Sequence, residues 1–121
     1  MSGPRQYCLT LNLKDDDALI LEYEEHHKPG NVWPEVIDNI RGAGILDMRI
    51  YRSGLQLIMV MTVSDTFSFA DKSLQDSLNP KIGVWENLME KFQDKAESAD
   101  SKWQEATSIF ELSKHQSSGM D

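Results

Sequence analysis

Residues 45–63 read ILDMRIYRSGLQLIMVMTV, and this stretch decides the fold. Two strand-like runs, residues 45–52 and 55–63, are joined by Ser53 and Gly54, and a short connection containing glycine is typical of a β-hairpin. Residues 57–61 are apolar at every position, whereas a strand with one face in water should alternate between apolar and polar side chains. Both faces of this strand are therefore expected to be covered.

The periodicity of apolar residues predicts the other elements. Residues 6–13 alternate in the manner of a strand, and the spacing of Trp85, Leu88, Met89 and Phe92 is that of an amphipathic helix. Three further helices are predicted. The first covers residues 18–27 and the third 66–78. The second is capped by Asn31, carries Pro34 in its first turn and stops at 42–44. Residues 94–102 are expected to form a loop and 107–112 a short final strand.

The predicted order is strand, helix, strand, strand, helix, strand, which is the split βαβ pattern of an α+β, ferredoxin-like fold. In that fold an antiparallel four-stranded sheet carries its helices on one face. The apolar run at 57–61 then predicts a second copy on the other face, so we expect a homodimer of the dimeric α/β barrel type. Residues 6–112 are expected to form the domain, with 1–5 as an N-terminal extension and 113–121 as a flexible tail.

Composition excludes several classes of function. The 121 residues include 20 acidic and 12 basic side chains, a formal net charge of −8, so nucleic acid and anionic membrane surfaces would be repelled. Cys8 is the single cysteine, which rules out an internal disulfide and suits a reducing compartment. Residues 1–7 lack the apolar run that is typical of a signal peptide, and no stretch approaches the roughly 18 apolar residues of a membrane span. We therefore expect a cytoplasmic protein without nucleic-acid or membrane partners.

Tyr23 and His27 are four residues apart, so they project from the same face of their helix. Histidine exchanges protons near neutral pH, and a phenol beside it would help to bind and protonate a polyol. The same pair is also common at the half-buried edge of an ordinary helix. Cys8 lies in the middle of a strand with no base near it in sequence, which is typical of a buried structural cysteine.

No metal is expected. Glu22, Glu25, His26 and Glu35 offer ligand atoms, but they lack the His-Glu-x-x-His spacing or a cluster of histidines. The tryptophans at 33, 85 and 103 can either stack on sugar faces or fill the core.

The stretch 23–36, YEEHHKPGNVWPEV, resembles the signature of the L-rhamnose/L-fucose mutarotase family. Later segments agree with this resemblance, namely RIY at 49–51, WENLMEKFQ at 85–93, KW at 102–103 and IFEL at 109–112. The likeness covers about residues 6–112. Members of this family are small dimeric ferredoxin-like enzymes that interconvert the anomers of 6-deoxy sugars, chemistry that needs no cofactor.

The resemblance implies that His27 is the proton donor and Tyr23 a substrate contact. Met48 stands where the family has a substrate-contacting tyrosine, and Glu86 follows Trp85 where the rhamnose members carry paired tryptophans. The two extra residues before Trp33 and the late Lys-Trp pair favour L-fucose over L-rhamnose. The expected substrate-binding residues are Tyr23, Trp33, Met48, Tyr51, Trp85, Glu86 and Trp103.

Some alternatives stay open at this stage. The partner base has three candidates, Glu35, Asp47 and Glu86. A non-catalytic small-ligand-binding module and a cofactor-free or haem-handling monooxygenase of the dimeric α/β barrel type are the competing functions.

Overall fold

The computed structural model describes residues 5–94 and 102–116. Most of the predicted extension, loop and tail, namely residues 1–4, 95–101 and 117–121, lies outside the described residues. The described strands are β1 (Arg5–Leu13), β2 (Ile45–Ser53), β3 (Gln56–Val63), β4 (Gln93–Asp94) and β5 (Gln104–Ala106). The described helices are α1 (Asp17–His26), α2 (Pro34–Gly42), α3 (Phe69–Ser77), α4 (Pro80–Glu90) and a 3-10 turn at Leu112–Lys114.

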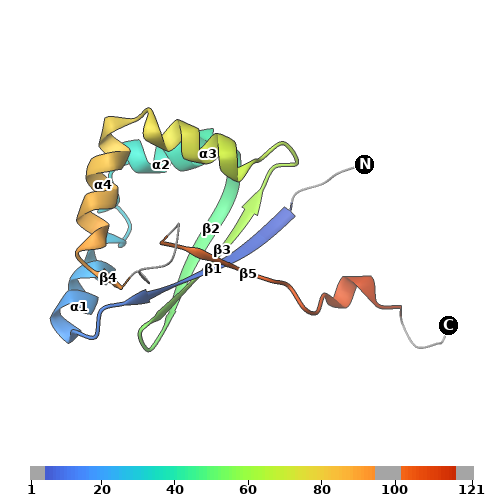
Figure 1. The fold of residues 1–121 in the computed structure, drawn as a ribbon, viewed down its shortest axis with the longest axis horizontal. Helices are drawn as coiled ribbons and strands as arrows, with labels where there is room; N and C mark the ends of the chain where they lie inside the picture. Colours follow the sequence, from blue (N-terminus) through green and yellow to red (C-terminus); the bar gives the residue numbers. More distant parts are fainter. Residues whose placement is uncertain (1–4, 95–101, 117–121) are drawn as a thin grey trace.

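The strands form one antiparallel sheet in the order β2-β3-β1-β4, with β5 also paired to β1 (Figure 1). The α+β fold with an antiparallel sheet is thus confirmed. The fourth position in the sheet is shared by two short strands, because β4 pairs with Asn12 and Leu13 while β5 pairs with Cys8, Leu9 and Thr10.

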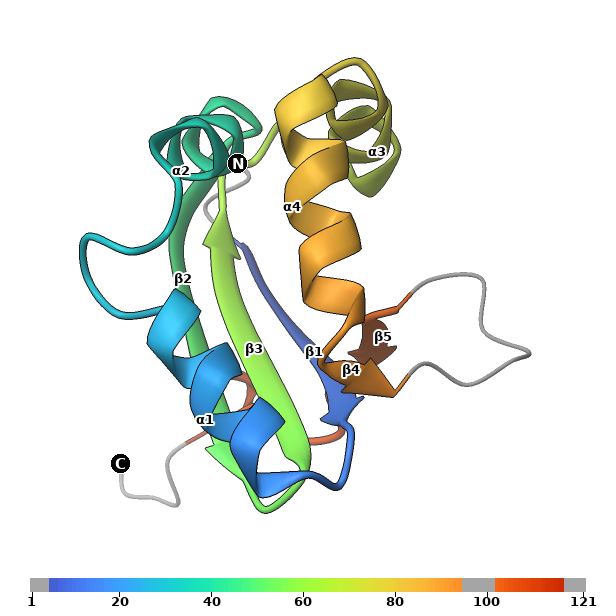
Figure 2. The same ribbon diagram turned by 90° about the vertical axis from the view of Figure 1, so that its left-hand side faces the viewer.

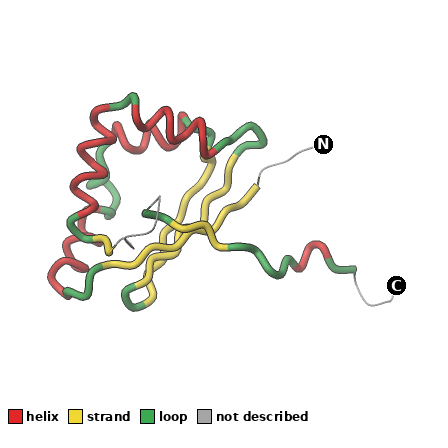
Figure 3. The backbone as a smooth tube through the Cα atoms, viewed as in Figure 1, coloured by secondary structure: helices red, strands yellow, loops and turns green. Residues whose placement is uncertain are grey.

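The final strand predicted at 107–112 is wrong. The strand is Gln104–Ala106, and residues 107–111 leave the sheet as loop (Figure 3). Thr107, Ile109 and Phe110 have the side chains that strands favour, but Ile109 is 95% exposed. The free edge of β1 decides which residues pair, since main-chain hydrogen bonds form regardless of side-chain type.

Two predicted helix starts also need correction. Helix α2 follows Trp33 directly and has no side-chain cap. Asn31, the expected cap, instead donates through Nδ2 to the Glu25 carbonyl at 2.8 Å, a last-turn carbonyl of α1 that also accepts from the Lys28 N–H at 3.3 Å. Helix α3 starts later than predicted because Ser68, whose hydroxyl accepts from the Asp71 N–H, caps it.

The described α-helices, α1 to α4, lie on one face of the sheet, as the view onto the helices shows (Figure 2). Alternate residues of the strands point toward them, among them Leu9 and Leu11 of β1 and Leu57 and Met61 of β3, which are all buried. The opposite face carries Tyr51, 51% exposed, with the half-buried residues of the central strands, Thr10, Ile58, Val60 and Thr62. Among the described residues no helix has the length and apolarity to cross a membrane.

Candidate active site

A cavity of about 500 Å³ lies between the sheet and the helices. Side chains of β1, β2 and β3, among them Met48, Met59 and Met61, line it together with residues of α1, α2 and α4. Its lining is mainly apolar, with a few convergent polar groups, and its volume falls within the roughly 300–1,000 Å³ of small-molecule sites.

The end of α1 fixes the orientation of His27. The His27 N–H turns back three residues to the Glu24 carbonyl at 3.1 Å, which leaves the Tyr23 carbonyl for the imidazole. His27 Nδ1 lies 2.8 Å from that carbonyl oxygen. Because a carbonyl oxygen can only accept, Nδ1 carries the proton and the neutral ring presents a lone pair at Nε2.

Burial lowers the pKa of His27 below its usual 6.5, and the hydrogen bond to the Tyr23 carbonyl opposes that shift only in part. The charge of the neighbouring His26 lowers the pKa further. His26 itself turns toward Glu22, with 3.7 Å between its Nε2 and the carboxylate. The neutral form of His27 is therefore the main form at neutral pH.

Tyr23 stays a neutral phenol. It is 4% exposed, and burial raises its pKa to about 12, with a side-chain hydrogen bond with Gln93 opposing the shift and the charge of Glu86 adding to it. The Tyr23 and His27 rings lie with their centroids 4.3 Å apart. The site thus places a proton donor beside a proton acceptor.

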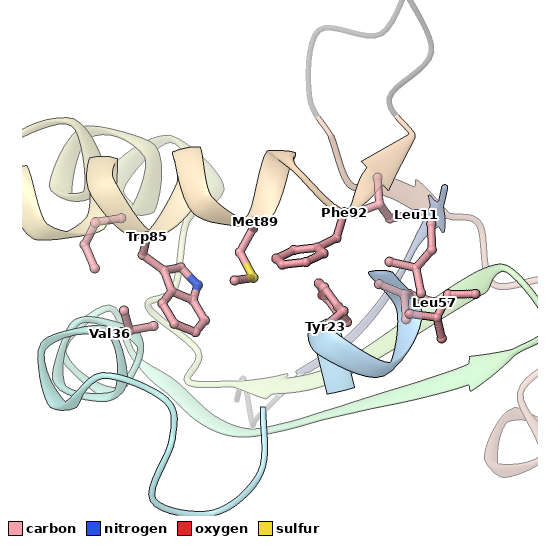
Figure 4. Packing of buried hydrophobic residues seen from close by; sticks show 10 residues of the cluster. Leu11, Tyr23, Val36, Leu57, Trp85, Met89 and Phe92 are labelled. Carbon is pink, nitrogen blue, oxygen red and sulfur yellow. The ribbon is translucent and has the colours of Figure 1, made fainter. Parts of the chain in front are cut away.

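Aromatic rings build the wall around this pair. Figure 4 shows Trp85, Met89 and Phe92 extending from α4 and the turn after it toward Tyr23 and Val36. The Trp85 ring centroid is 5.7 Å from that of His27 in an edge-on arrangement, so the indole packs against the imidazole.

Glu86, Gln93 and Lys102 supply further polar groups to the cavity. Lys102 Nζ donates to the Glu86 backbone carbonyl at 3.1 Å and lies 3.3 Å from the Glu90 carboxylate. Among the described residues, the side-chain oxygens Glu86 Oε2 and Gln93 Oε1 are buried without a hydrogen-bond partner. Leaving such a group unsatisfied costs about 1–3 kcal/mol, so these two oxygens are unlike the rest of the core.

A second polar cluster lines the cavity from α2 and α3. Asn39 Nδ2 donates to Asp76 Oδ1 at 2.6 Å, and Gln75 Nε2 donates to the Asn39 carbonyl and side-chain oxygens at 2.8 and 2.9 Å. Lys72 Nζ donates to both Asp76 oxygens, at 2.8 and 2.6 Å. This cluster satisfies its members internally.

The structure brings most of the expected site residues together. The cavity is lined by Tyr23, His27, Met48, Trp85, Glu86 and Trp103. Trp33 does not line the cavity, and its ring centroid is 5.1 Å from that of Trp85. Tyr51 pairs with Ile58 on the opposite face of the sheet, away from the cavity.

Of the three candidate bases, only Glu86 lines the cavity. Glu35 is exposed on α2, and Asp47 lies 3.7 Å from Arg49 on the outer face of the sheet. Sequence reasoning missed Gln93, which it treated as part of a motif. Gln93 begins β4, after α4 has ended at Glu90, so helical spacing from Glu86 gave no signal for it. Among the described residues, no group of three or more His, Cys, Asp or Glu is placed to hold a metal ion.

Comparisons with known proteins show the family of this chain. The family model described as L-rhamnose mutarotase matches residues 6–112. An L-fucose mutarotase of Xanthomonas campestris is 43% identical over 111 residues, which cover 90% of this chain and 89% of that protein. A UPF0734 protein of Dictyostelium discoideum is 38% identical over 92 residues, which cover 75% of this chain and 72% of that protein.

The fold also has a solved counterpart. The crystal structure of an L-rhamnose mutarotase from Formosa agariphila superposes with a TM-score of 0.66 at 14% identity, covering 89% of this chain and 98% of that one. At this identity the likeness speaks for the fold, while the family model and the sequence relatives speak for descent. The chain belongs to the L-rhamnose mutarotase family.

Proposed function

We propose that this protein interconverts the α and β anomers of L-fucose, with L-rhamnose as the second candidate substrate. Family membership makes the chain a sugar mutarotase, and the relative of 43% identity that is named an L-fucose mutarotase favours that sugar. The observation that carries the mechanism is the His27 imidazole, anchored through Nδ1 at 2.8 Å to the Tyr23 carbonyl so that Nε2 is free to exchange protons.

Mutarotation breaks the bond between C1 and the ring oxygen, lets the aldehyde rotate, and forms the bond again. In the proposed opening step, His27 Nε2 accepts the proton of the anomeric hydroxyl while the Tyr23 hydroxyl donates its proton to the ring oxygen. Ring closure runs the same transfers backwards, so the imidazolium is the proton donor to the carbonyl oxygen. Each proton returns to its origin, and the reaction needs no oxidant or co-reactant.

The lining of the cavity suits a 6-deoxy sugar. Such a sugar carries a methyl group at C6 where an ordinary hexose carries a hydroxymethyl group. The methionine floor of Met48, Met59 and Met61 offers apolar, adaptable packing for that methyl group. The Trp85 indole offers a surface for the C–H-rich face of the ring.

Saturation-transfer NMR of the anomeric protons tests the activity with L-fucose and L-rhamnose. The wild-type protein is expected to accelerate exchange, and His27→Gln to lose roughly 10²–10⁴-fold of that rate. His26→Gln is the matched control, because His26 pairs with Glu22 at 3.7 Å and does not line the cavity. Exchange in His27→Gln at the wild-type rate would remove His27 from the mechanism. Sugar binding by the wild type without faster exchange would make the protein a binding module.

We also propose that the protein is a cytoplasmic homodimer, with the sheet face opposite the helices as the contact. Ile58 and Val60 are apolar residues on that face, where Tyr51 pairs with Ile58 and Arg49 pairs with Val60. Sedimentation equilibrium is expected to give a dimer, and Val60→Asp is expected to shift it toward the monomer. A wild-type monomer at micromolar concentration would contradict this assembly.

A further inference from the structure

We propose that Glu86 and Gln93 accept hydrogen bonds from two hydroxyl groups of the sugar and thereby set which stereoisomer the enzyme prefers. This inference rests on the proposed function and adds the residues that read the substrate. It concerns specificity, whereas Tyr23 and His27 carry the proton transfer.

Both of the unpaired oxygen atoms are hydrogen-bond acceptors. Glu86 Oε2 and Gln93 Oε1 are buried, and neither has a partner among the described residues. A carboxylate oxygen and an amide carbonyl oxygen are both pure acceptors, so the missing partners must be donors. The nearby cation does not supply them, because Lys102 Nζ is directed to the Glu86 backbone carbonyl at 3.1 Å and to Glu90 at 3.3 Å.

The two acceptors limit the chemistry of a ligand that can bind to them. Two acceptors, one of them negatively charged, disfavour an anionic ligand such as a carboxylate or a phosphate. They favour a neutral ligand with several O–H donors. A polyhydroxyl ring is such a ligand, and its remaining surface fits the apolar lining of the cavity.

Glu86 and Gln93 both lie beside Tyr23, the proposed donor to the ring oxygen. Gln93 hydrogen-bonds with the side chain of Tyr23, and Glu86 lies close enough for its charge to act on the phenol. Both residues therefore border the group that faces the reacting ring oxygen. Hydroxyls bound by Glu86 and Gln93 would fix the orientation of C1 and the ring oxygen against Tyr23 and His27.

Two fixed acceptors can also discriminate between L-fucose and L-rhamnose. L-fucose and L-rhamnose have the same atoms and the same methyl group, and they differ in configuration at C2 and C4. Size and apolarity therefore separate them poorly, whereas two fixed acceptors can separate them well. An isomer whose hydroxyl points elsewhere leaves a buried acceptor unpaired, which is the strongest form of rejection by binding.

The experiment measures kcat and KM for anomer exchange of L-fucose, L-rhamnose and the 2-deoxy and 4-deoxy forms of the preferred sugar. The variants are Glu86→Gln, which keeps the shape of the side chain, and Gln93→Met, which removes the acceptor at similar volume. Each is expected to lower kcat/KM for the preferred sugar roughly 10- to 100-fold and to narrow the preference between the two sugars. Glu90→Gln is the control, since Glu90 contacts Lys102 from outside the cavity lining.

A matching deletion on the substrate sharpens the test. Each variant is expected to lose its effect with the one deoxy sugar that lacks its hydroxyl partner, while both deoxy sugars lose activity with the wild type. The wild-type measurement does not depend on whether a variant folds. Equal kcat/KM for the parent and both deoxy sugars with the wild type would overturn the inference.

The failure of this inference can be told from failure of the proposed function. Wild-type protein that accelerates exchange of neither sugar overturns the function itself. Wild-type protein that accelerates exchange, with a sugar preference that Glu86→Gln and Gln93→Met both leave unchanged, overturns only the assignment of these residues.

Discussion

Two polar clusters line the same cavity, and they differ in whether their hydrogen-bonding groups have partners. The cluster between α2 and α3 is closed, because Asn39, Gln75, Asp76 and Lys72 satisfy one another at 2.6–2.9 Å. The cluster around Tyr23 and His27 is open, with the acceptors of Glu86 and Gln93 left unpaired among the described residues. Polar groups in the first cluster hold helices together, while the unpaired acceptors of the second are the ones that we propose bind the hydroxyl groups of the sugar.

The contrast teaches how to separate structural from functional polar groups in one cavity. Burial does not separate them, since Asn39 is 7% exposed and Gln93 is also 7% exposed. Whether each polar group has a hydrogen-bond partner does separate the structural groups from the functional ones, because folding alone gives no reason to bury an acceptor without a donor. Substitutions in the open cluster should therefore change activity, and substitutions in the closed cluster should change stability.

Tyr23→Phe has the largest expected effect. Removing the hydroxyl deletes the proposed donor to the ring oxygen, so kcat for anomer exchange should fall roughly 100-fold or more. The ring stays packed against Phe92, 5.8 Å between centroids, so the loss of stability should be limited to the hydrogen bond with Gln93, about 1–3 kcal/mol. Exchange NMR and circular dichroism measure the two quantities, and Tyr51→Phe on the outer face of the sheet is the control. A large loss of stability with normal kcat would place Tyr23 among structural residues.

Asn39→Ala should show the opposite pattern. The substitution removes the acceptor for Gln75 and the donor to Asp76, and we expect the free energy of unfolding to fall by about 1–3 kcal/mol. Below the melting temperature, kcat should stay within a few-fold of the wild type. Urea denaturation checks the first expectation, with Asn87→Ala on the exposed side of α4 as the control. A selective loss of kcat in Asn39→Ala would assign the closed cluster to catalysis.

The pH profile distinguishes the clusters next. The pKa of His27 is lowered below 6.5 by burial, and the proposed base is the neutral form. The kcat/KM for exchange should therefore be flat above that pKa and fall about tenfold per pH unit below it. The sign is decisive, because a resting enzyme that starts from protonated His27 would instead lose activity as the pH rises. His26→Gln removes the neighbouring charge that lowers the pKa of His27, so the acid limb should move to higher pH in that variant while the plateau rate stays near the wild-type value.

Local patterns in the sequence predicted the parts of this site that short-range geometry determines. The i, i+4 spacing of Tyr23 and His27 places both on one face of α1, and the alternation of β2 places Met48 and Tyr51 on opposite faces. Trp33 was harder to place, because its indole packs against Trp85 and does not line the cavity, which depends on how α2 and α4 approach each other.

The pairing of distant segments was beyond the local pattern. Gln104–Ala106 forms the strand beside β1 although all three residues are exposed and two of them are polar, whereas the more strand-like 107–112 does not. The closed cluster joins residues 36 or 37 positions apart in the chain, and no sequence periodicity reports such contacts. Unpaired acceptors are likewise a property of the assembled cavity alone.

Glu86→Met is the smallest expected effect and the most direct test of the comparison. If the buried Glu86 oxygen awaits a ligand, then replacing the carboxylate with an apolar chain of similar length removes an unsatisfied group from the free protein. The free energy of unfolding should therefore rise, by about 1 kcal/mol, while exchange activity falls. Urea denaturation without sugar measures the gain, and added L-fucose should stabilise the wild type more than the variant. A variant that is less stable than the wild type would mean that Glu86 already serves the fold, and the line between the open and closed clusters would disappear.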